Sequence, residues 1–576
     1  MNARLFTVIA ISLLGACTAD SQFTPADTVF FGGEILTVEG PTSEYVEAIG
    51  VTDGIITQLG DASAIEKYRG KNTQVIDLEG KTLLPGFFDS HSHLASVGMK
   101  LATVNLDSKP AGNITSIDDI VSQLKARLSD NPPPEGEWLL GMGYDNAMLA
   151  ENRHPTKVDL DKVSTEIPIV IIHFSMHMAV LNSKALELEN ITAASVDPAG
   201  GVIRRAENGN EPNGILEETA MRGPLLKTIA ALGDGSRYGN KTFIERGLEV
   251  YAKNGFTTVI EGAATPVQIM AFKQLASEQR LGQDVIALQF FETAGVDDVK
   301  KAYSNRYQNR FRVGGGKVVL DGGSPGRTAY LRSPYHTSTH GQATDYRGYP
   351  TIEEQLSLNL LVDSYYQSNT PIFIHALGDA AIDMSIGAVE YAEANIDAPH
   401  DKRTQIIHAQ QVQPDQFDVL KDLDITITFQ MAHNFYFGDY HRDYIYGPER
   451  TDRLNPIKSA MDLGIPSTIH HDAPVHPVDQ MMLISSAVNR TSRRGIVGGK
   501  EEQITPYQAV QASTINAAYQ FFEGDRKGSL RLGKIADLVI LDENPLTSAR
   551  EDIRDIEVVQ TVKDGITIWS RNDALE

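Results

Sequence analysis

The chain has 576 residues, 41% of them hydrophobic, and carries 51 basic against 75 acidic side chains, a formal net charge of −24 at pH 7. This length exceeds one small core, so we expect several domains or one large barrel with additions. The acidic balance, with no Lys- or Arg-rich run to offset it, argues against a nucleic-acid partner, because the phosphate backbone attracts positive charge.

Residues 1–17 have the pattern of a bacterial export signal, with Arg4 followed by an apolar run too short to span a bilayer. The run ends in Leu-Gly-Ala-Cys, which resembles the lipobox and implies cleavage before Cys17 and lipidation of its thiol. Residues 18–26 would then be a tether. Because Thr18 lacks the acidic character of an inner-membrane retention signal, we expect a cell-envelope lipoprotein that faces the periplasm from the outer membrane and contacts the membrane through its lipid alone. A plain secretory signal with an incidental cysteine is the alternative.

Short β segments punctuated by glycine occupy both ends of the mature chain. Residues 27–83 contain several such runs, with Asp53-Gly54 as a hairpin signal between two of them. Residues 526–576 contain similar runs at 536–541 and 558–562. We predict that the two regions build one small β-sandwich domain.

Residues 84–525 alternate apolar runs with helical patterns, which indicates a parallel sheet covered on both faces. The strand before His91 and seven later runs make eight, the number that closes a TIM-like (β/α)₈ barrel. Those runs are 256–260, 284–289, 317–320, 371–374, 404–407, 425–428 and 465–469. A doubly wound open sheet is the alternative, but no Gly-x-Gly-x-x-Gly or phosphate-binding loop follows any of these strands. Residues of about 100–245 do not fit the alternation and are predicted to be an insertion after the first barrel strand, over the active-site mouth.

Histidines follow several of these strands, at the barrel end where such folds place their chemistry. His91 and His93 can present both imidazoles to one point, because alternate residues of a strand face the same side. His375, His408 and the run His470-His471-Asp472 follow three further strands. A lone histidine at a strand end is usually structural, but four strand ends that bear His or Asp indicate a metal centre.

Several motifs resemble the amidohydrolase superfamily, and within it the family-3 branch that includes N-substituted formamide deformylases. The motifs are 85–93, 316–317, 374–376, 407–410 and 472–474, supported by 180–186, 214–220, 321–329 and 528–538. The resemblance covers nearly the whole mature chain, and it specifies the superfamily better than a substrate. It implies that one or two divalent ions are bound by His91, His93, His375, His408 and Asp472, with Lys317 carboxylated on its amine to bridge two ions.

The bridging ligand has two candidates. An unmodified lysine has only donors, whereas its carbamate supplies oxygen ligands. Glu261 stands at another strand end and could serve in place of Lys317. With an unmodified Lys317 we expect a single ion. Zn²⁺ is the default because imidazole and carboxylate suit it.

The resemblance implies hydrolysis by a metal-activated hydroxide. Asp472 would orient the water, accept its proton and return it to the leaving group as general base and acid. His177, in the insertion, is our candidate for polarising the carbonyl, unless it is a satisfied buried histidine. Tyr144, Arg327 and His433 are predicted to line the substrate pocket. Aromatic residues around His433 hint at a substrate with an apolar part.

The chain departs from the branch just before Asp472, where a small residue is common. His471 stands there, preceded by His470. We interpret this pair either as partners behind the ligands or as surface histidines.

The predicted function is hydrolysis of a C–N bond in a small-molecule amide, formamide or cyclic amide. An esterase or lactonase with the same metal site is the second interpretation. A non-catalytic binding protein that kept the barrel is the third, and the complete His/Asp set argues against it. The sequence leaves the oligomeric state open, a homodimer included.

Overall fold

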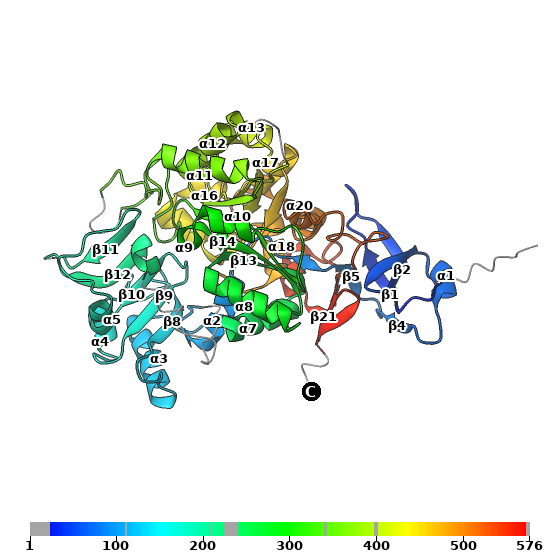
Figure 1. Ribbon diagram of the computed structural model, residues 1–576, viewed down its shortest axis with the longest axis horizontal. Coiled ribbons are helices and arrows are strands. Elements are labelled where there is room, and N and C mark those ends of the chain that lie inside the picture. The colour runs from blue at the N-terminus through cyan, green and yellow to red at the C-terminus, as the bar shows by residue number, and fades with distance from the viewer. Residues whose placement is uncertain are drawn as a thin grey trace, which may run out of the picture.

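The computed structural model describes residues 24–109, 112–207, 209–223, 240–338, 343–396 and 401–571. Figure 1 shows three parts along the long axis: the insertion in cyan at one end, a sheet in blue and red at the other, and the large α/β unit between them. The predicted signal peptide, with Cys17, and most of the tether lie outside these residues. Within them, no helix is long and apolar enough to cross a membrane.

Strands from both ends of the chain form one sheet of eight strands. Its order is β22-β21-β20-β5-β1-β2-β3, with β4 paired to β1. These strands are β1 (Thr28–Leu36), β2 (Tyr45–Thr52), β3 (Ile55–Gly60), β4 (Gln74–Asp77), β5 (Thr82–Pro85), β20 (Leu538–Leu541), β21 (Val558–Lys563) and β22 (Ile566–Ser570). Asp53 and Gly54, between β2 and β3, have φ values of 50° and 74°, as a two-residue type I′ turn requires. The sandwich arrangement stays a prediction.

The central sheet confirms the prediction of eight parallel strands. In sheet order they are β19 (Ser467–Ile469), β18 (Thr426–Phe429), β17 (Gln405–His408), β16 (Ile372–Ala376), β15 (Phe311–Val319), β14 (Asp284–Phe290), β13 (Phe256–Ala264) and β6 (Phe87–Phe88). The sheet curls so that its edges meet: Ser90 Oγ donates to the Ile469 carbonyl at 2.9 Å, and His93 N donates to the Ala473 carbonyl at 2.8 Å. Complete (β/α)₈ closure stays a prediction.

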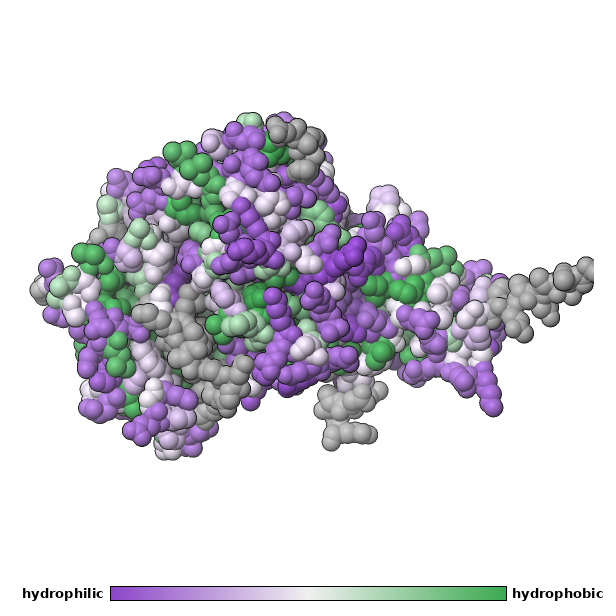
Figure 2. Space-filling model, viewed as in Figure 1, coloured by the Kyte–Doolittle hydropathy of each residue, from purple (hydrophilic) through white to green (hydrophobic). Residues whose placement is uncertain are grey.

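Helices connect and cover these strands. They are α2 (Leu94–Ala102), α7 (Asn240–Lys253), α8 (Pro266–Ser277), α9 (Phe291–Ala294), α10 (Val296–Ala302), α11 (Gln355–Gln367), α12 (Asp379–Ala394), α13 (Pro414–Asp422), α14 (Ala432–Tyr436), α16 (Pro448–Asp452), α17 (Ile457–Asp462), α18 (Gln480–Asn489), α19 (Pro506–Ala512) and α20 (Ile515–Gln520). Their apolar sides pack on the sheet in one large cluster of buried residues. Figure 2 shows that the face turned to the viewer is mostly hydrophilic, with hydrophobic residues in small groups.

One strand begins earlier than the sequence predicted. The apolar run was expected to open at Lys317, but β15 begins at Phe311 and places Lys317 near its C-terminal end. Three glycines, residues 314–316, hid the first half of the strand. They are needed there, since a Cβ on Gly316 would lie 2.5 Å from the ring of Tyr365. The correction moves Lys317 to the edge of the sheet where the other predicted ligands lie.

The insertion has a sheet of its own, with the order β11-β12-β10-β9-β8-β7. Its elements are β7 (Val104–Asn105), α3 (Ile117–Asp130), β8 (Leu139–Tyr144), α4 (Lys157–Asp161), β9 (Ile169–His173), β10 (Met178–Leu181), α5 (Ser183–Leu188), β11 (Gly201–Arg205) and β12 (Pro212–Glu218). The tight connection between β9 and β10 carries His177.

Buried ion pairs join the central sheet to the terminal sheet at the end opposite the predicted ligands. Lys527 Nζ lies 2.6 Å from Asp284 Oδ2, at the first residue of β14. Lys563, on β21, reaches the same carboxylate at 3.0 Å and Asp537 at 2.9 Å. All four side chains are buried. Because each charge has an opposite neighbour, the group holds the two sheets together.

Replacing Lys527 with methionine should lower the free energy of unfolding by about 3 kcal/mol, because it leaves buried carboxylate charge with less compensation. Urea unfolding followed by circular dichroism measures the change. Lys301→Met is the matched control. Lys301 pairs with Asp298, and the two side chains are 78% and 64% exposed, so the substitution should change the free energy of unfolding by less than about 1 kcal/mol. Equal effects of the two substitutions would contradict this role of the buried group.

Candidate metal centre

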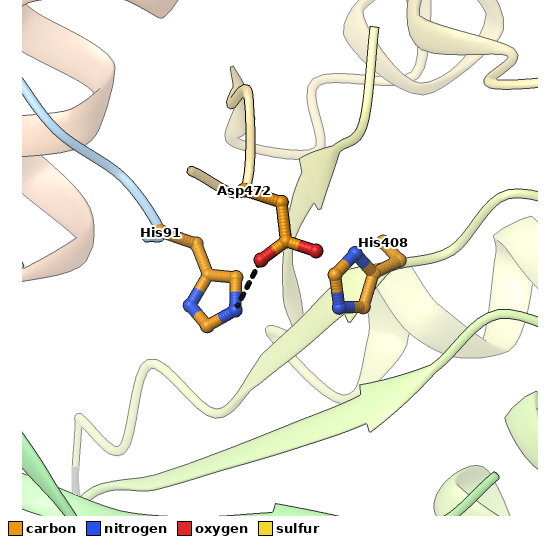
Figure 3. A group of neighbouring side chains, drawn as sticks. All are labelled: His91, His408 and Asp472. Atoms are coloured by element: carbon orange, nitrogen blue, oxygen red, sulfur yellow. Dashed lines mark ion pairs between the residues drawn. The ribbon is translucent and has the colours of Figure 1, made fainter. Parts of the chain in front are cut away.

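Three side chains from three strand ends converge at the centre of the curled sheet. Ligand atoms of His91, His408 and Asp472 all lie within 4.8 Å of one another. Figure 3 shows the carboxylate of Asp472 between the two imidazoles, with Oδ1 3.3 Å from His91 Nε2. All three residues are buried. His91 follows β6, His408 ends β17, and Asp472 follows β19, so parallel strand direction brings them to one edge.

The other three predicted ligands lie beside this group. His93 Nε2 is 3.4 Å from Asp472 Oδ1. The His375 ring centroid is 4.3 Å from that of His408. Lys317 Nζ is 3.4 Å from His91 Nε2. The structure therefore brings all six predicted ligand side chains together.

The chemistry of these side chains fits a divalent cation. Among the described residues, no hydrogen-bond partner is found for the buried atoms His375 Nε2, His408 Nδ1 and Asp472 Oδ1. Burial lowers the pKa of His375 and of His408 well below the ordinary value, so both rings are neutral, the form that binds metal. Burial would raise the pKa of Asp472, but His93 lowers it below its usual range, so the carboxylate is ionised. Neutral nitrogens and one carboxylate are a typical ligand set for Zn²⁺.

Lys317 and Glu261 both line the cavity beside this group but differ in their contacts. Burial lowers the pKa of Lys317 to about 7, which favours the neutral amine that carbamate formation requires. Glu261 Oε2 accepts the Ala95 backbone N–H at 2.8 Å, and Oε1 lies 3.9 Å from His93 Nδ1. In this arrangement Glu261 fixes the start of α2 and orients His93.

Asp89 holds the His-x-His segment in place. It accepts hydrogen bonds from the backbone N–H groups of His91 at 3.2 Å and Ile260 at 3.1 Å, and from the Ser92 hydroxyl. Burial raises its pKa to about 7. These bonds tie β6 to β13 directly below the ligands and so fix where the two imidazoles lie.

An open cavity with about 960 Å³ of empty space adjoins the group. Its polar wall includes His93, Lys317, His375, His408 and Asp472. The rest of the lining combines polar residues with an apolar set, which is Met176, Met221, Ala263, Phe290, Val319 and Val475. A small molecule with one polar, reactive end and one apolar end suits this shape.

His177 lines the same cavity, with its ring centroid 5.1 Å from that of His375. Its Nδ1 lies 2.8 Å from Glu218 Oε2. Arg222 donates to the same Glu218 oxygen at 3.3 Å and to Glu292 Oε1 at 2.7 Å. The sequence interpretation missed Glu218 and Arg222. The only signal was the motif at 214–220, which contains Glu218 but suggested no partner for it.

Tyr144, Arg327 and His433, predicted to line the substrate pocket, are not among the residues that line this cavity, and their contact with a substrate stays a prediction. Tyr144 is fully buried in the insertion, with its hydroxyl 3.1 Å from His154 Nδ1. Arg327 donates to the hydroxyl of Thr337 at 2.9 Å. His433 is buried, with its Nδ1 2.7 Å from Gln410 Nε2. Each side chain is held by neighbours within the protein.

The residues before Asp472 are not a surface pair, because His470 and His471 are each only 1% exposed. Burial lowers the pKa of each ring to about 3. His471 Nδ1 accepts the Ala473 backbone N–H at 3.0 Å. On the other side, Gln430 Nε2 donates to Asp472 Oδ2 at 3.1 Å and so orients the carboxylate.

Comparison with known proteins places this arrangement in a family. N-substituted formamide deformylase of Arthrobacter pascens is 24% identical over 553 residues, 95% of this chain and 98% of that protein. Putative amidohydrolase YtcJ of Bacillus subtilis (strain 168) is 26% identical over 564 residues, 94% of this chain and 99% of that protein.

Similarity to solved structures supports the fold. An uncharacterized metal-dependent hydrolase from Pyrococcus horikoshii OT3 aligns with a TM-score of 0.70 and 24% identity, over 91% of this chain and 99% of that chain. The family model described as "Amidohydrolase family" matches residues 74–568, most of the chain. The chain therefore belongs to the amidohydrolase family.

Proposed function

We propose that the protein hydrolyses the C–N bond of a small-molecule amide, formamide or cyclic amide with one or two divalent ions, Zn²⁺ first among them. The observation that carries this proposal is the convergence of His91, His408 and Asp472, with unpartnered buried atoms, on an open cavity. Full-length similarity to an N-substituted formamide deformylase supports the choice of bond.

The residues that would hold the cation are the six predicted ligands: His91, His93, Lys317, His375, His408 and Asp472. When bound, a divalent ion would supply Lewis-acid activation of water and of the carbonyl. Asp472 accepts a proton from the attacking water and passes it to the leaving nitrogen. The side-chain amide of Gln430 donates a hydrogen bond to Oδ2. Oδ1, which faces His91 and His93, is therefore the oxygen available for this transfer.

His177 would contact the substrate carbonyl, since it lines the cavity with its ring 5.1 Å from that of His375. The Nδ1 contact with Glu218 fixes the orientation of the ring and leaves Nε2 for the substrate. Arg222, bonded to Glu218 and Glu292, has its charge compensated within the protein. Together with the apolar lining, this compensation favours an uncharged substrate that carries an apolar substituent.

Metal analysis and a substrate panel on the form that lacks residues 1–17 test the proposal. We expect bound divalent metal and hydrolysis of amides, formamides or cyclic amides. Asp472→Asn should keep metal and lose about 10²- to 10⁴-fold in kcat/KM, because the proton acceptor is removed.

Other outcomes of that experiment would identify the alternatives. Hydrolysis confined to esters or lactones would contradict C–N specificity. Purified protein that stays metal-free and inactive after Zn²⁺ reconstitution would favour a binding protein. Full activity of Asp472→Asn would overturn the assigned proton transfer.

The bridging ligand can be assigned by paired substitutions. If carboxylated Lys317 bridges two ions, Lys317→Ala should bind fewer ions per chain than wild type, and mass spectrometry of the native protein should show the added CO₂. Glu261→Gln keeps the size of the side chain and an oxygen that can accept the Ala95 N–H, and it should leave the number of ions bound per chain unchanged. The reverse pattern, with metal lost only from Glu261→Gln, would assign the bridge to Glu261.

We also propose that Cys17 is lipidated and holds the protein on the cell envelope, facing the periplasm. The support is the Leu-Gly-Ala-Cys motif and the lack of any other cysteine in the sequence. Radiolabelled lipid should be incorporated into the wild type and into Thr18→Ala, but not into Cys17→Ala. A Cys17→Ala protein that still carries label would refute the anchor, and membrane fractionation would locate the labelled form.

A further inference from the structure

His470 lies directly beside the ligand group, although neither the resemblance nor the comparisons assign it a role. It is 1% exposed. Its ring centroid is 4.9 Å from that of His408 and 5.3 Å from that of His91. It stands two residues before Asp472, directly after β19 (Ser467–Ile469), on the same strand-end loop as that carboxylate.

Both ring nitrogens of His470 lack a hydrogen-bond partner within the described residues. The neighbouring His408 Nδ1 is equally unpartnered. His91 faces the group through Nε2, which lies 3.3 Å from Asp472 Oδ1. A neutral imidazole has one donor and one acceptor, and leaving either unpaired when buried costs about 1–3 kcal/mol. His470 and His408 are therefore adjacent rings with unpaired buried nitrogens, beside the imidazole of His91, and this favours a cation bound among them.

His441 shows why the neighbours matter more than the missing bonds. It is also fully buried, with both nitrogens unpartnered among the described residues. Its ring neighbours are Phe437, Tyr446 and His433, and the last is bonded through Nδ1 to Gln410. Only one of those ring neighbours is a histidine, whereas His470 lies beside the two histidines His91 and His408 and close in sequence to the Asp472 carboxylate.

We propose that His470 is an additional imidazole ligand of the metal centre, on the His91 and His408 side of the site. The inference rests on the metal centre of the proposed function and adds a fifth histidine to its ligands. Carboxylate-rich sites suit Mg²⁺, Ca²⁺ and Mn²⁺, whereas imidazole suits Zn²⁺ and its neighbours. A neutral ligand also adds no negative charge, so the bound ion keeps more of its Lewis acidity.

The experiment compares metal binding by His470→Ala, His470→Gln and the control His441→Gln in the form that lacks residues 1–17. Competition with a chelator gives the Zn²⁺ affinity, and the visible spectrum of the Co²⁺-loaded protein reports the ligand set. Both His470 variants should bind Zn²⁺ at least about tenfold more weakly and show an altered Co²⁺ spectrum. His441→Gln should match wild type in both measurements.

A further variant separates ligation from packing. His470→Gly leaves a space of the size of the lost ring, so added free imidazole should restore Zn²⁺ affinity there. The His470→Ala and His470→Gln affinities decide the matter if the glycine variant does not fold.

Each outcome bears on one claim. Wild-type affinity and an unchanged Co²⁺ spectrum in the His470 variants would overturn the assignment of His470 and leave the proposed function standing. A wild-type protein that binds no divalent metal would instead overturn the proposed function itself. An equal loss of affinity in His441→Gln would show that His470 acts through general packing, and would overturn direct ligation.

Discussion

The site depends on a set of buried imidazoles and one carboxylate that have few hydrogen-bond partners of their own. His375 Nε2, His408 Nδ1 and Asp472 Oδ1 are all in this state. Buried polar atoms without a partner destabilise a folded chain unless a hydrogen bond or a bound ligand satisfies them. The parallel sheet tolerates them because its own backbone bonds are satisfied along every strand pair and a large apolar cluster surrounds it. A bound cation would satisfy these atoms, so metal binding would raise the free energy of unfolding of the protein.

The two ends of the central sheet handle buried charge in opposite ways. At the N-terminal ends of the strands, Lys527, Asp284, Lys563 and Asp537 compensate one another within hydrogen-bonding distance. At the C-terminal ends, Asp472 Oδ1 lies near His91 and His93, but His375 Nε2, His408 Nδ1 and both nitrogens of His470 have no hydrogen-bond partner among the described residues. Burial is equal in the two groups but pairing is not: only the second keeps buried ring nitrogens without a hydrogen-bond partner among the described residues, which is typical of a ligand-binding group rather than a structural one.

The sequence predicted which side chains would converge, and the reason is simple. His91, His375, His408 and Asp472 each follow an apolar run, and parallel strands deliver the residues that follow them to the same edge. Lys317 was identified, but its place in the strand was wrong, because Gly314 to Gly316 do not look like a strand without the Tyr365 ring that packs on them.

The insertion was much less predictable, because its contacts link residues far apart in the chain. The pairing of His177 with Glu218 spans 41 positions and depends on β10 lying next to β12. Tyr144 shows the same limit: its position at the end of β8 says nothing about His154, whose Nδ1 lies 3.1 Å from the tyrosine hydroxyl. Burial of His470 was equally hidden, since no local pattern distinguishes an inward histidine from an exposed one at a strand end.

The charges around the cavity limit how the protein could select its substrate. Arg222 is compensated by Glu218 and Glu292, and His177 is held by the same Glu218. No described cationic side chain of the insertion wall is therefore left to attract an anionic substrate. An amide and an ester of one shape would fit the remaining apolar lining equally well. They differ in the leaving group, since an amine must receive a proton to depart. In the proposed mechanism, the choice between the two bonds accordingly depends on the proton that Asp472 would deliver to the leaving group.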